Sequence, residues 1–319
     1  MLLFFDIDGT LFDDSRKLPA SVLPALEKAH ENGHLLFINT GRTLCNQDHR
    51  LDGFPVDGWI MGCGTRIVFR GETLQSMEYD LARSLRLRQL FLDLNVPLTY
   101  ECDTAIYFDP LAPSHPAIPL FRQYARAHGL DRDITETDPE FRAVKMFCFS
   151  ETRDLIDRIE AATAAIGMPY TAIDRGKGGW EVVPAAFSKG TGIDVIRQKL
   201  NVSMEDCFAF GDSRNDMPMF EHVGNSIAMG NAPEDVKAAC SYVTDFPEKD
   251  GIKKAMIHFG IIADKERSLY FSPSSSFSRL NRAASWGAGS ASGMIRQCCS
   301  TSASFSTSSN GESTVSLSL

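Results

Sequence analysis

The feature that most constrains this chain is an apolar run at its beginning that ends in two carboxylates. From Leu2 to Thr10 the sequence reads LLFFDIDGT. A continuous apolar run is typical of a strand buried on both faces of a parallel sheet, and such sheets bind ligands beyond the carboxyl ends of their strands. Residues two apart on an extended chain point to the same side, so Asp6 and Asp8 are expected to present their carboxylates together. Taken alone, Asp8-Gly9 also fits a plain turn with Asp6 as a capping residue.

Composition limits the classes of protein that this chain can be. The 319 residues, 43% of them hydrophobic, suffice for two modest domains. The net charge of −9 argues against a nucleic-acid partner, which requires clustered Lys and Arg. No run approaches the ~18 apolar residues of a membrane span, and no signal-like leader precedes the first strand. Eight cysteines without a C-x-x-C pattern do not indicate a disulfide scaffold or a zinc ribbon. We therefore expect a cytoplasmic protein without a membrane or nucleic-acid partner.

Short apolar runs alternate with helical patterns in both outer parts of the chain. Strands are predicted at Leu2–Phe5, Leu35–Ile38, Cys207–Phe210, Ser226–Ala228 and Tyr242–Thr244. Helices are predicted at Ala20–Glu31, Thr191–Leu200 and Pro233–Ala239, with Ser188 as the N-cap of the second. This alternation predicts an α/β fold with a Rossmann-like parallel sheet.

The middle of the chain has a different rhythm. Helices are predicted at Ser84–Leu94, Ile118–Ala127 and Thr152–Ile166, and strands at Thr99–Glu101, Ala105–Phe108, Val144–Phe149, Tyr170–Ile173 and Trp180–Val183. This mixture predicts an α+β module with an antiparallel sheet. We therefore expect a core made of residues 1–80 and 184–265 and an inserted cap made of residues 81–183. The serine-rich residues 266–319 have no apolar periodicity and are expected to be a disordered tail without function, rather than a regulatory one.

Three further segments place polar groups near predicted strand ends or at a helix start. They are TGR at residues 40–42, SKG at 188–190 and GDSRND at 211–216. A helix start with a lysine favours an anion, and acid and amide groups in a short loop resemble hard-cation ligands. Each has an ordinary alternative: Thr40 as a helix cap, Lys189 as surface charge, and the third segment as a turn.

Together the four segments, in this order, resemble the motifs of haloacid dehalogenase (HAD) superfamily phosphatases of the Cof type, which carry an inserted α/β cap. The resemblance covers about residues 1–262. The segments VKM at 144–146, MGNA at 229–232 and DGI at 250–252 also match. One loop differs, because relatives have Asn-Gly-Ala after the third strand and this chain has Cys-Gly-Thr at residues 63–65. The substrate preference of typical members is therefore not transferred.

The resemblance implies a HAD-type phosphoric monoester hydrolase. It would depend on Mg²⁺ and act on small phosphorylated metabolites such as sugar phosphates. Asp6 would attack phosphorus and form an aspartyl-phosphate, and Asp8 would serve as general acid and then as general base. Mg²⁺ would bind the Asp6 carboxylate, the Asp8 backbone carbonyl and Asp212.

The resemblance also implies a phosphate site. Its expected members are Thr40, Gly41, Arg42, Lys189 and Asn215. Lys189 would also be catalytic through its charge. Asp216 would orient Lys189 or a metal-bound water.

Two alternatives to a phosphatase stay open at this point. A hexose phosphomutase or phosphotransferase would use the same chemistry, and a non-catalytic protein would only bind a phosphorylated ligand. The chain is expected to be a monomer or a homodimer. Arg42 and Lys145 could each reach a phosphate of the substrate, but each is more often surface charge. Trp180 and Glu181 are expected to pack at the end of the cap rather than recognise substrate.

Overall fold

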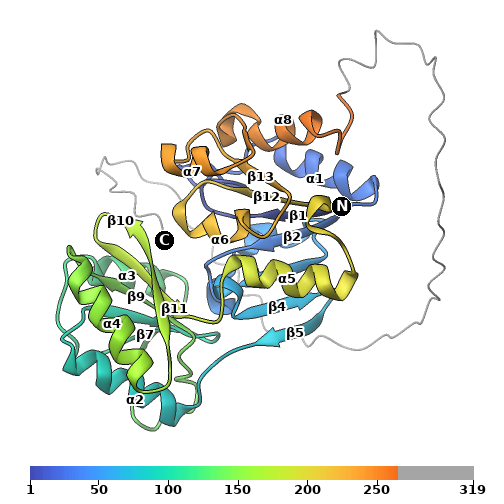
Figure 1. The fold of residues 1–319 in the computed structure, drawn as a ribbon. Helices are drawn as coiled ribbons and strands as arrows, with labels where there is room; N and C mark the ends of the chain where they lie inside the picture. The colour runs from blue at the N-terminus through green and yellow to red at the C-terminus, as the bar shows by residue number, and fades with distance from the viewer. Residues whose placement is uncertain (265–319) are drawn as a thin grey trace, which may run out of the picture. The chain divides into compact units, whose positions relative to one another are not determined.

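The structure, a computed structural model, describes residues 1–264, which form two β-sheets with their helices (Figure 1). The tail predicted at residues 266–319 lies outside the described residues. No helix among the described residues has the length and apolar character needed to span a bilayer.

The first sheet has eight strands in the order β14-β13-β12-β1-β2-β3-β4-β5. Their bounds are β1 Leu2–Phe5, β2 Leu35–Asn39, β3 Gly58–Met61, β4 Arg66–Phe69, β5 Glu72–Ser76, β12 Cys207–Gly211, β13 Asn225–Ala228 and β14 Tyr242–Val243. The strands from β14 to β3 run parallel, and β4 and β5 extend the sheet in antiparallel fashion. The predicted parallel sheet is confirmed, and its central strand β1 is the one that leads into Asp6.

Helices cover both faces of this sheet, as continuous apolar strands require (Figure 1). The helices are α1 Val22–Glu31, α5 Lys189–Leu200, α6 Met217–Phe220, α7 Glu234–Ala239 and α8 Gly251–His258. Leu3 and Phe5 pack in one cluster with residues of α1 and α8, whereas Leu2 and Phe4 pack in another with residues of α5, α6 and α7. The alternation of side chains along β1 therefore builds both halves of the core.

The second sheet is formed by residues between β5 and α5. Its six strands follow the order β10-β11-β9-β6-β7-β8. Their bounds are β6 Leu98–Glu101, β7 Ile106–Phe108, β8 Asp131–Asp133, β9 Lys145–Phe149, β10 Tyr170–Gly176 and β11 Gly179–Pro184. The accompanying helices are α2 Leu81–Asp93, α3 Ile118–Ala127 and α4 Arg153–Ala165. The pairing is antiparallel except between β7 and β8, which are parallel. The sequence of β8, Asp-Arg-Asp, has no apolar pattern from which a strand could be predicted.

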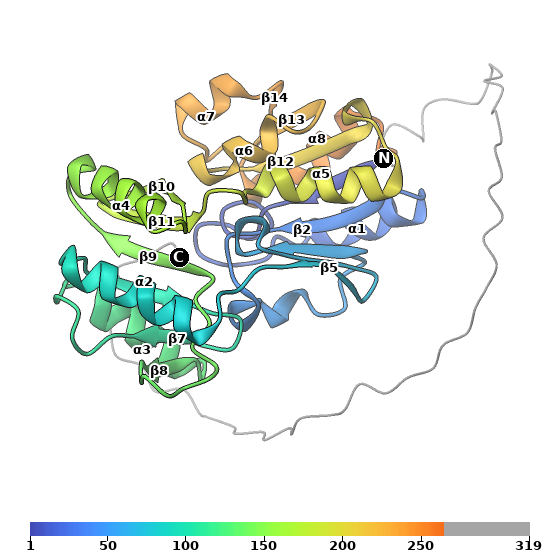
Figure 2. The same cartoon turned by 60° about the horizontal axis from the view of Figure 1, so that its bottom comes forward.

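This second sheet also has helices on both faces. Met146 and Cys148 of β9 pack in a cluster with residues of α2 and α4, which contact each other (Figures 1 and 2). Phe147 and Phe149, which alternate with them, contact Phe121 of α3 at ring-centroid distances of 5.1 and 5.4 Å. Residues 1–263 nevertheless cluster as one compact unit, so the division into a core and a cap stays a prediction.

Short 3₁₀ helices complete the described elements. They are η1 Leu44–Asn46, η2 His49–Leu51, η3 Gly62–Gly64, η4 Met204–Asp206, η5 Arg214–Asp216 and η6 Pro247–Lys249. Of these, η5 follows β12 and carries two of the predicted site residues.

The packing of β1 gives a first testable prediction. Phe5 is fully buried, with its ring centroid 4.6 Å from that of Phe210. Phe5→Ala should lower the free energy of unfolding by about 3–5 kcal/mol, because the sheet and the helices α1 and α8 that pack on this face can close the cavity only in part. Chemical denaturation measures this loss. Leu111→Ala is the control, since Leu111 is 70% exposed, and it should change stability by less than about 0.5 kcal/mol. A loss of under about 1 kcal/mol in Phe5→Ala would contradict this account of the core.

Candidate active site

Three neighbouring parallel strands end at the same edge of the first sheet. Asp6 directly follows β1, Thr40 follows β2 and Asp212 follows β12. Strand β1 pairs with both β2 and β12, and the backbone N–H of Asp6 donates to the carbonyl of Phe210 at 3.0 Å. The topology therefore brings together residues that are more than 200 positions apart in the sequence.

Lys189 joins this cluster from the first turn of α5. Its ammonium Nζ lies 2.7 Å from Asp6 Oδ1 and 2.6 Å from Asp216 Oδ1, and its side chain is fully buried. The helix start is fixed by Ser188, whose hydroxyl accepts from the N–H of Thr191, as the predicted N-cap does. The pKa of Lys189 lies above its ordinary value, because attraction from Asp216 and Asp6 outweighs burial, the largest single effect. The site therefore holds a permanent cation beside Asp6.

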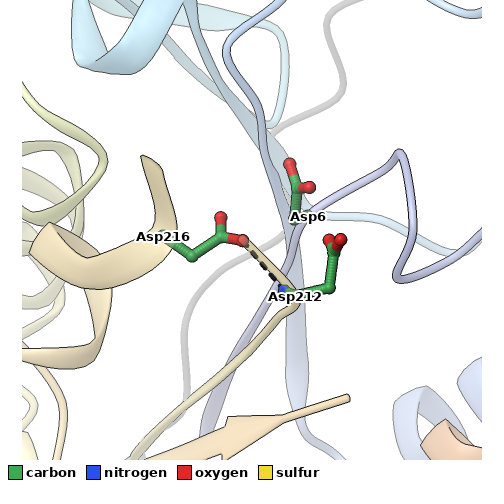
Figure 3. Close-up of side chains that lie close together, drawn as sticks. All are labelled: Asp6, Asp212 and Asp216. Carbon is green, nitrogen blue, oxygen red and sulfur yellow. Dashed lines mark hydrogen bonds between the residues drawn. The ribbon is translucent and has the colours of Figure 1, made fainter. Parts of the chain in front are cut away.

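Three carboxylates, two of them paired with Lys189, lie close together at this edge of the sheet (Figure 3). One oxygen from each of Asp6, Asp212 and Asp216 lies within 4.8 Å of the others. Burial raises the pKa of Asp6 to about 7, with Lys189 opposing and Asp216 adding to the rise. Burial, Asp216 and Asp6 likewise raise the pKa of Asp212 well above its ordinary value. The simultaneous ionisation of these carboxyl groups is therefore disfavoured, and a further cation would stabilise their ionised forms.

The donor set fits a magnesium ion. Both oxygens of Asp216 are already engaged, one by Lys189 and the other by the N–H groups of Asp212 and Ser213 at 2.9 Å (Figure 3). Within residues 1–264, by contrast, the side chain of Asp212 accepts from the hydroxyl of Thr10 at 3.1 Å, and no cationic side chain lies within 4.0 Å of it. Asp6 and Asp212 would thus offer hard oxygen ligands to Mg²⁺.

A glycine is required beside this pair. Gly9 has a φ of +83°, and a Cβ at its position would lie 2.3 Å from Asp212 Oδ2. Its carbonyl accepts from the side-chain amide of Asn231 at 3.0 Å, which fixes the turn after β1. This close approach explains why glycine follows the second carboxylate of the motif.

Asp8 is held by a bidentate ion pair. Its two oxygens accept from Nε and Nη2 of Arg42 at 2.9 and 2.7 Å. Arg42 also contacts Asp48 at 3.3 Å and is only 8% exposed. The structure therefore places Arg42 as the partner of Asp8. Its predicted contact with phosphate stays a prediction.

The remaining predicted phosphate ligands surround Asn215. The amide of Asn215 accepts from Lys189 at 3.5 Å and donates to Glu181 at 3.5 Å. A Cβ at Gly41 would lie 2.8 Å from Glu181 Oε1 and 3.5 Å from Asn215 Nδ2, so this backbone adjoins the same space. The hydroxyl oxygen of Thr40 accepts from the N–H of Arg42 at 3.2 Å, which leaves its proton available to a ligand.

Several residues at the site lie outside the predicted set. Glu181 of β11 accepts from Lys145 at 3.0 Å, and Lys145 also lies 3.3 Å from Glu101. Attraction from Lys145 and Arg175 lowers the pKa of Glu181 although burial, the largest effect, opposes this. Glu181 thus belongs to a buried charged network, and the expectation that it packs rather than recognises substrate stays a prediction. Surface charge for Lys145 is wrong, because Lys145 is buried. In both cases the sequence contains one signal of a role beyond packing or surface charge, which is a single charged residue within an otherwise apolar strand.

Comparisons with known proteins agree with this geometry. The family model described as haloacid dehalogenase-like hydrolase matches residues 3–256. The HMP-PP phosphatase of Citrobacter koseri is 29% identical over 240 residues, which is 72% of this chain and 84% of that protein. The solved HAD subclass IIB sugar phosphatase BT4131 has a TM-score of 0.68 at 28% identity, over 82% of this chain and 99% of its own. BT1666 from Bacteroides thetaiotaomicron, among the phosphatases of that superfamily, has a TM-score of 0.68 at 26% identity, over 82% and 95%.

The excess of carboxylates predicts a metal-dependent gain in stability. Mg²⁺ added to chelator-treated protein should raise the thermal unfolding midpoint, and at 100 times the dissociation constant it should add about 2.7 kcal/mol. Asp212→Asn should abolish this gain, because it removes a carboxylate that is not paired with any cationic side chain of residues 1–264 and is therefore available to Mg²⁺. It should also stabilise the metal-free protein, since it removes a half-buried carboxyl group whose ionised form is disfavoured by burial and by Asp216 and Asp6.

The matched control is Asp93→Asn, which removes an exposed carboxylate from α2 and should leave the Mg²⁺ response unchanged. An equal Mg²⁺ response in Asp212→Asn and in the unaltered protein would place the cation elsewhere.

Proposed function

Because the chain belongs to the haloacid dehalogenase-like hydrolase family, we propose that it is a magnesium-dependent phosphatase of small phosphorylated metabolites. The family and the fold class predicted from the four motifs are confirmed, as is the assignment to the phosphoric monoester hydrolases. The observation that carries the finer proposal is the buried bridge from Lys189 to Asp6 and Asp216, with Asp212 beside it.

Asp6 is the nucleophile in this proposal. One of its carboxylate oxygens attacks phosphorus, the bond from phosphorus to the leaving alcohol breaks, and a phosphoryl group remains on Asp6. Bound Mg²⁺ would be held by Asp6 and Asp212 and would supply positive charge that offsets the phosphoryl oxygens and favours the ionised carboxylate. Lys189 supplies a second positive charge at a fixed position, which needs no reorganisation during the reaction.

Asp8 transfers the protons in both steps. It donates a proton to the oxygen of the leaving alcohol, and then accepts one from the water that cleaves the aspartyl-phosphate. The fork of Arg42 binds both oxygens of Asp8 and fixes the plane of its carboxyl group, and Asp8 gives up one of these contacts when it carries the proton. Thr40, the backbone at Gly41 and Asn215 are proposed to donate to the phosphoryl oxygens.

The walls of the site favour a hydroxyl-rich leaving group. Glu181, Lys145 and Glu101 are buried and form one charged network close to Gly41 and Asn215. Such groups can form hydrogen bonds with the hydroxyls of a sugar phosphate. An apolar alcohol in the same place could not form these hydrogen bonds. The sugar phosphatase and HMP-PP phosphatase among the relatives support this class of substrate. We propose cytoplasmic phosphorylated metabolites, sugar phosphates first, as its substrates.

A panel of phosphorylated sugars, nucleotides and cofactors tests the proposal, with free phosphate measured in the presence of Mg²⁺. Release of phosphate supports a phosphatase. An isomerised sugar phosphate without free phosphate would instead support a mutase, and binding without either product would support a non-catalytic protein.

The two carboxylates after β1 have separable roles in this mechanism. Asp6→Asn should abolish turnover and phosphoenzyme formation, because the nucleophile is lost. Asp8→Asn should lower the rate on a sugar phosphate by about 10²–10⁴-fold, since an alkoxide leaves poorly without a proton. It should lose far less on p-nitrophenyl phosphate, whose leaving group needs no proton. Steady-state rates on both substrates measure the difference.

A covalent species provides the second readout. With the aryl ester, Asp8→Asn should accumulate a hydroxylamine-labile acyl-phosphate, because the same residue activates the water of the second step. Asp93→Asn should retain normal rates as the control. Equal losses of Asp8→Asn on both substrates without a trapped intermediate would show that Asp8 only positions its neighbours.

A further inference from the structure

We propose that Arg175, which comes from the second sheet, binds the phosphoryl group of the substrate together with Lys189. This inference rests on the proposed phosphatase function and adds to it a residue that lies outside the four motifs. Arg175 is the penultimate residue of β10, next to the tight connection between β10 and β11.

The position of Arg175 connects the second sheet with the nucleophile. Strand β10 packs against η5, the turn that carries Asn215. Nη1 of Arg175 donates to Ser213 Oγ at 3.2 Å, and that hydroxyl donates to Asn215 Oδ1 at 2.7 Å. Asn215 Oδ1 in turn lies 3.5 Å from the ammonium of Lys189, which contacts Asp6. A hydrogen-bonded chain thus runs from the guanidinium to the nucleophile.

The charge pairing around the site sets Arg175 apart. The other three cations are each shared by two carboxylates. These pairings are Lys189 with Asp6 and Asp216, Lys145 with Glu101 and Glu181, and Arg42 with Asp8 and Asp48. Within residues 1–264, Arg175 has no carboxylate oxygen within 4.0 Å, and its hydrogen-bond partner is the neutral hydroxyl of Ser213. A guanidinium has five N–H donors, so most of its donor capacity is available to an anion.

The surroundings keep this side chain charged. Burial is the largest effect and lowers the pKa of Arg175, but attraction from Glu181, Asp6 and Asp216 more than compensates. A phosphoryl group bound at Asp6 would therefore be attracted by an ionised guanidinium, whose planar fork matches two phosphate oxygens. Ser213 is then the partner that Arg175 uses when no phosphate is bound.

Two substitutions of Arg175 test the inference. Arg175→Ala should lower kcat/KM by about 10²–10³-fold on a sugar phosphate and on p-nitrophenyl phosphate alike, because both carry the same phosphoryl group. It should also weaken competitive inhibition by inorganic phosphate. Arg175→Lys should recover part of both, since it keeps the charge but loses the fork, and guanidinium ion added at low concentration should partly rescue Arg175→Ala. An unchanged thermal midpoint in both variants separates these effects from misfolding.

A neighbouring cation provides the matched control. Lys177 is exposed in the same hairpin with a φ of +52°, a conformation that asparagine tolerates. Lys177→Asn removes one positive charge near the site and should leave both parameters within about twofold, because a solvated charge contributes little.

The outcomes against the inference are distinct from those against the phosphatase. If the unaltered protein releases phosphate while Arg175→Ala keeps its kcat/KM and its inhibition by inorganic phosphate, the inference alone is wrong. A loss confined to substrates with a second anionic group would also overturn it, since Arg175 would then bind the leaving group. If the unaltered protein releases no phosphate, the inference is tested by calorimetry, which measures the binding of inorganic phosphate to the unaltered protein and to Arg175→Ala. Weaker binding to the variant supports the inference. Equal binding to both proteins, or no binding to either, overturns it.

Discussion

The structure of the site depends on one buried ammonium. Lys189 lies between Asp6 and Asp216 and thereby joins the end of β1, the start of α5 and the turn after β12. Removing charges from water costs several kcal/mol for each ion, so the arrangement persists only because each partner is paired. The carbonyl of Lys189 also accepts from the Asn39 side chain at 3.0 Å, which fixes the helix start against β2. Loss of any one partner would leave a buried charge uncompensated.

The charges of this arrangement do not balance. One ammonium faces three carboxylates, and the raised pKa values of Asp6 and Asp212 show how strongly their ionised forms are disfavoured without another cation. A fully neutralised site would fold more stably and have no affinity for a metal ion or for the phosphate that accompanies it. The excess of carboxylates is thus a cost in stability that the binding of a divalent cation would offset.

Much of this could be predicted from the sequence, for a physical reason. The strands of a parallel sheet are continuous apolar runs, so Asp6, Thr40 and Asp212 stand out where the runs LLFF, LLFIN and CFAFG end. What could not be predicted are contacts made by long side chains between elements of different sheets. Arg175 reaches Ser213, and Glu181 reaches Asn215, across 38 and 34 positions of sequence whose spacing carries no signal. Strand β8 could not be predicted either, because its three polar residues form a strand only through pairing with β7.

The distribution of charge also bears on how the enzyme would select its substrate. Three contacts join the second sheet and its helix α3 to the turns around the first sheet through polar groups: Arg175 with Ser213, Glu181 with Asn215, and Tyr124 with Asn46 at 2.6 Å. Polar contacts of this kind can be exchanged for contacts with a ligand, whereas an apolar seam would have to be exposed to water. A phosphate that took the donors of Arg175, and hydroxyls that paired with Glu181 and Lys145, would replace one hydrogen-bonded arrangement by another at little cost. A substrate that displaced these contacts without replacing them would leave buried charges unpaired, and rejection of this kind reaches 10⁴–10⁵-fold in sites built to hydrogen-bond their substrates. Selectivity in this fold would therefore come from polar contacts that a wrong leaving group breaks and cannot replace.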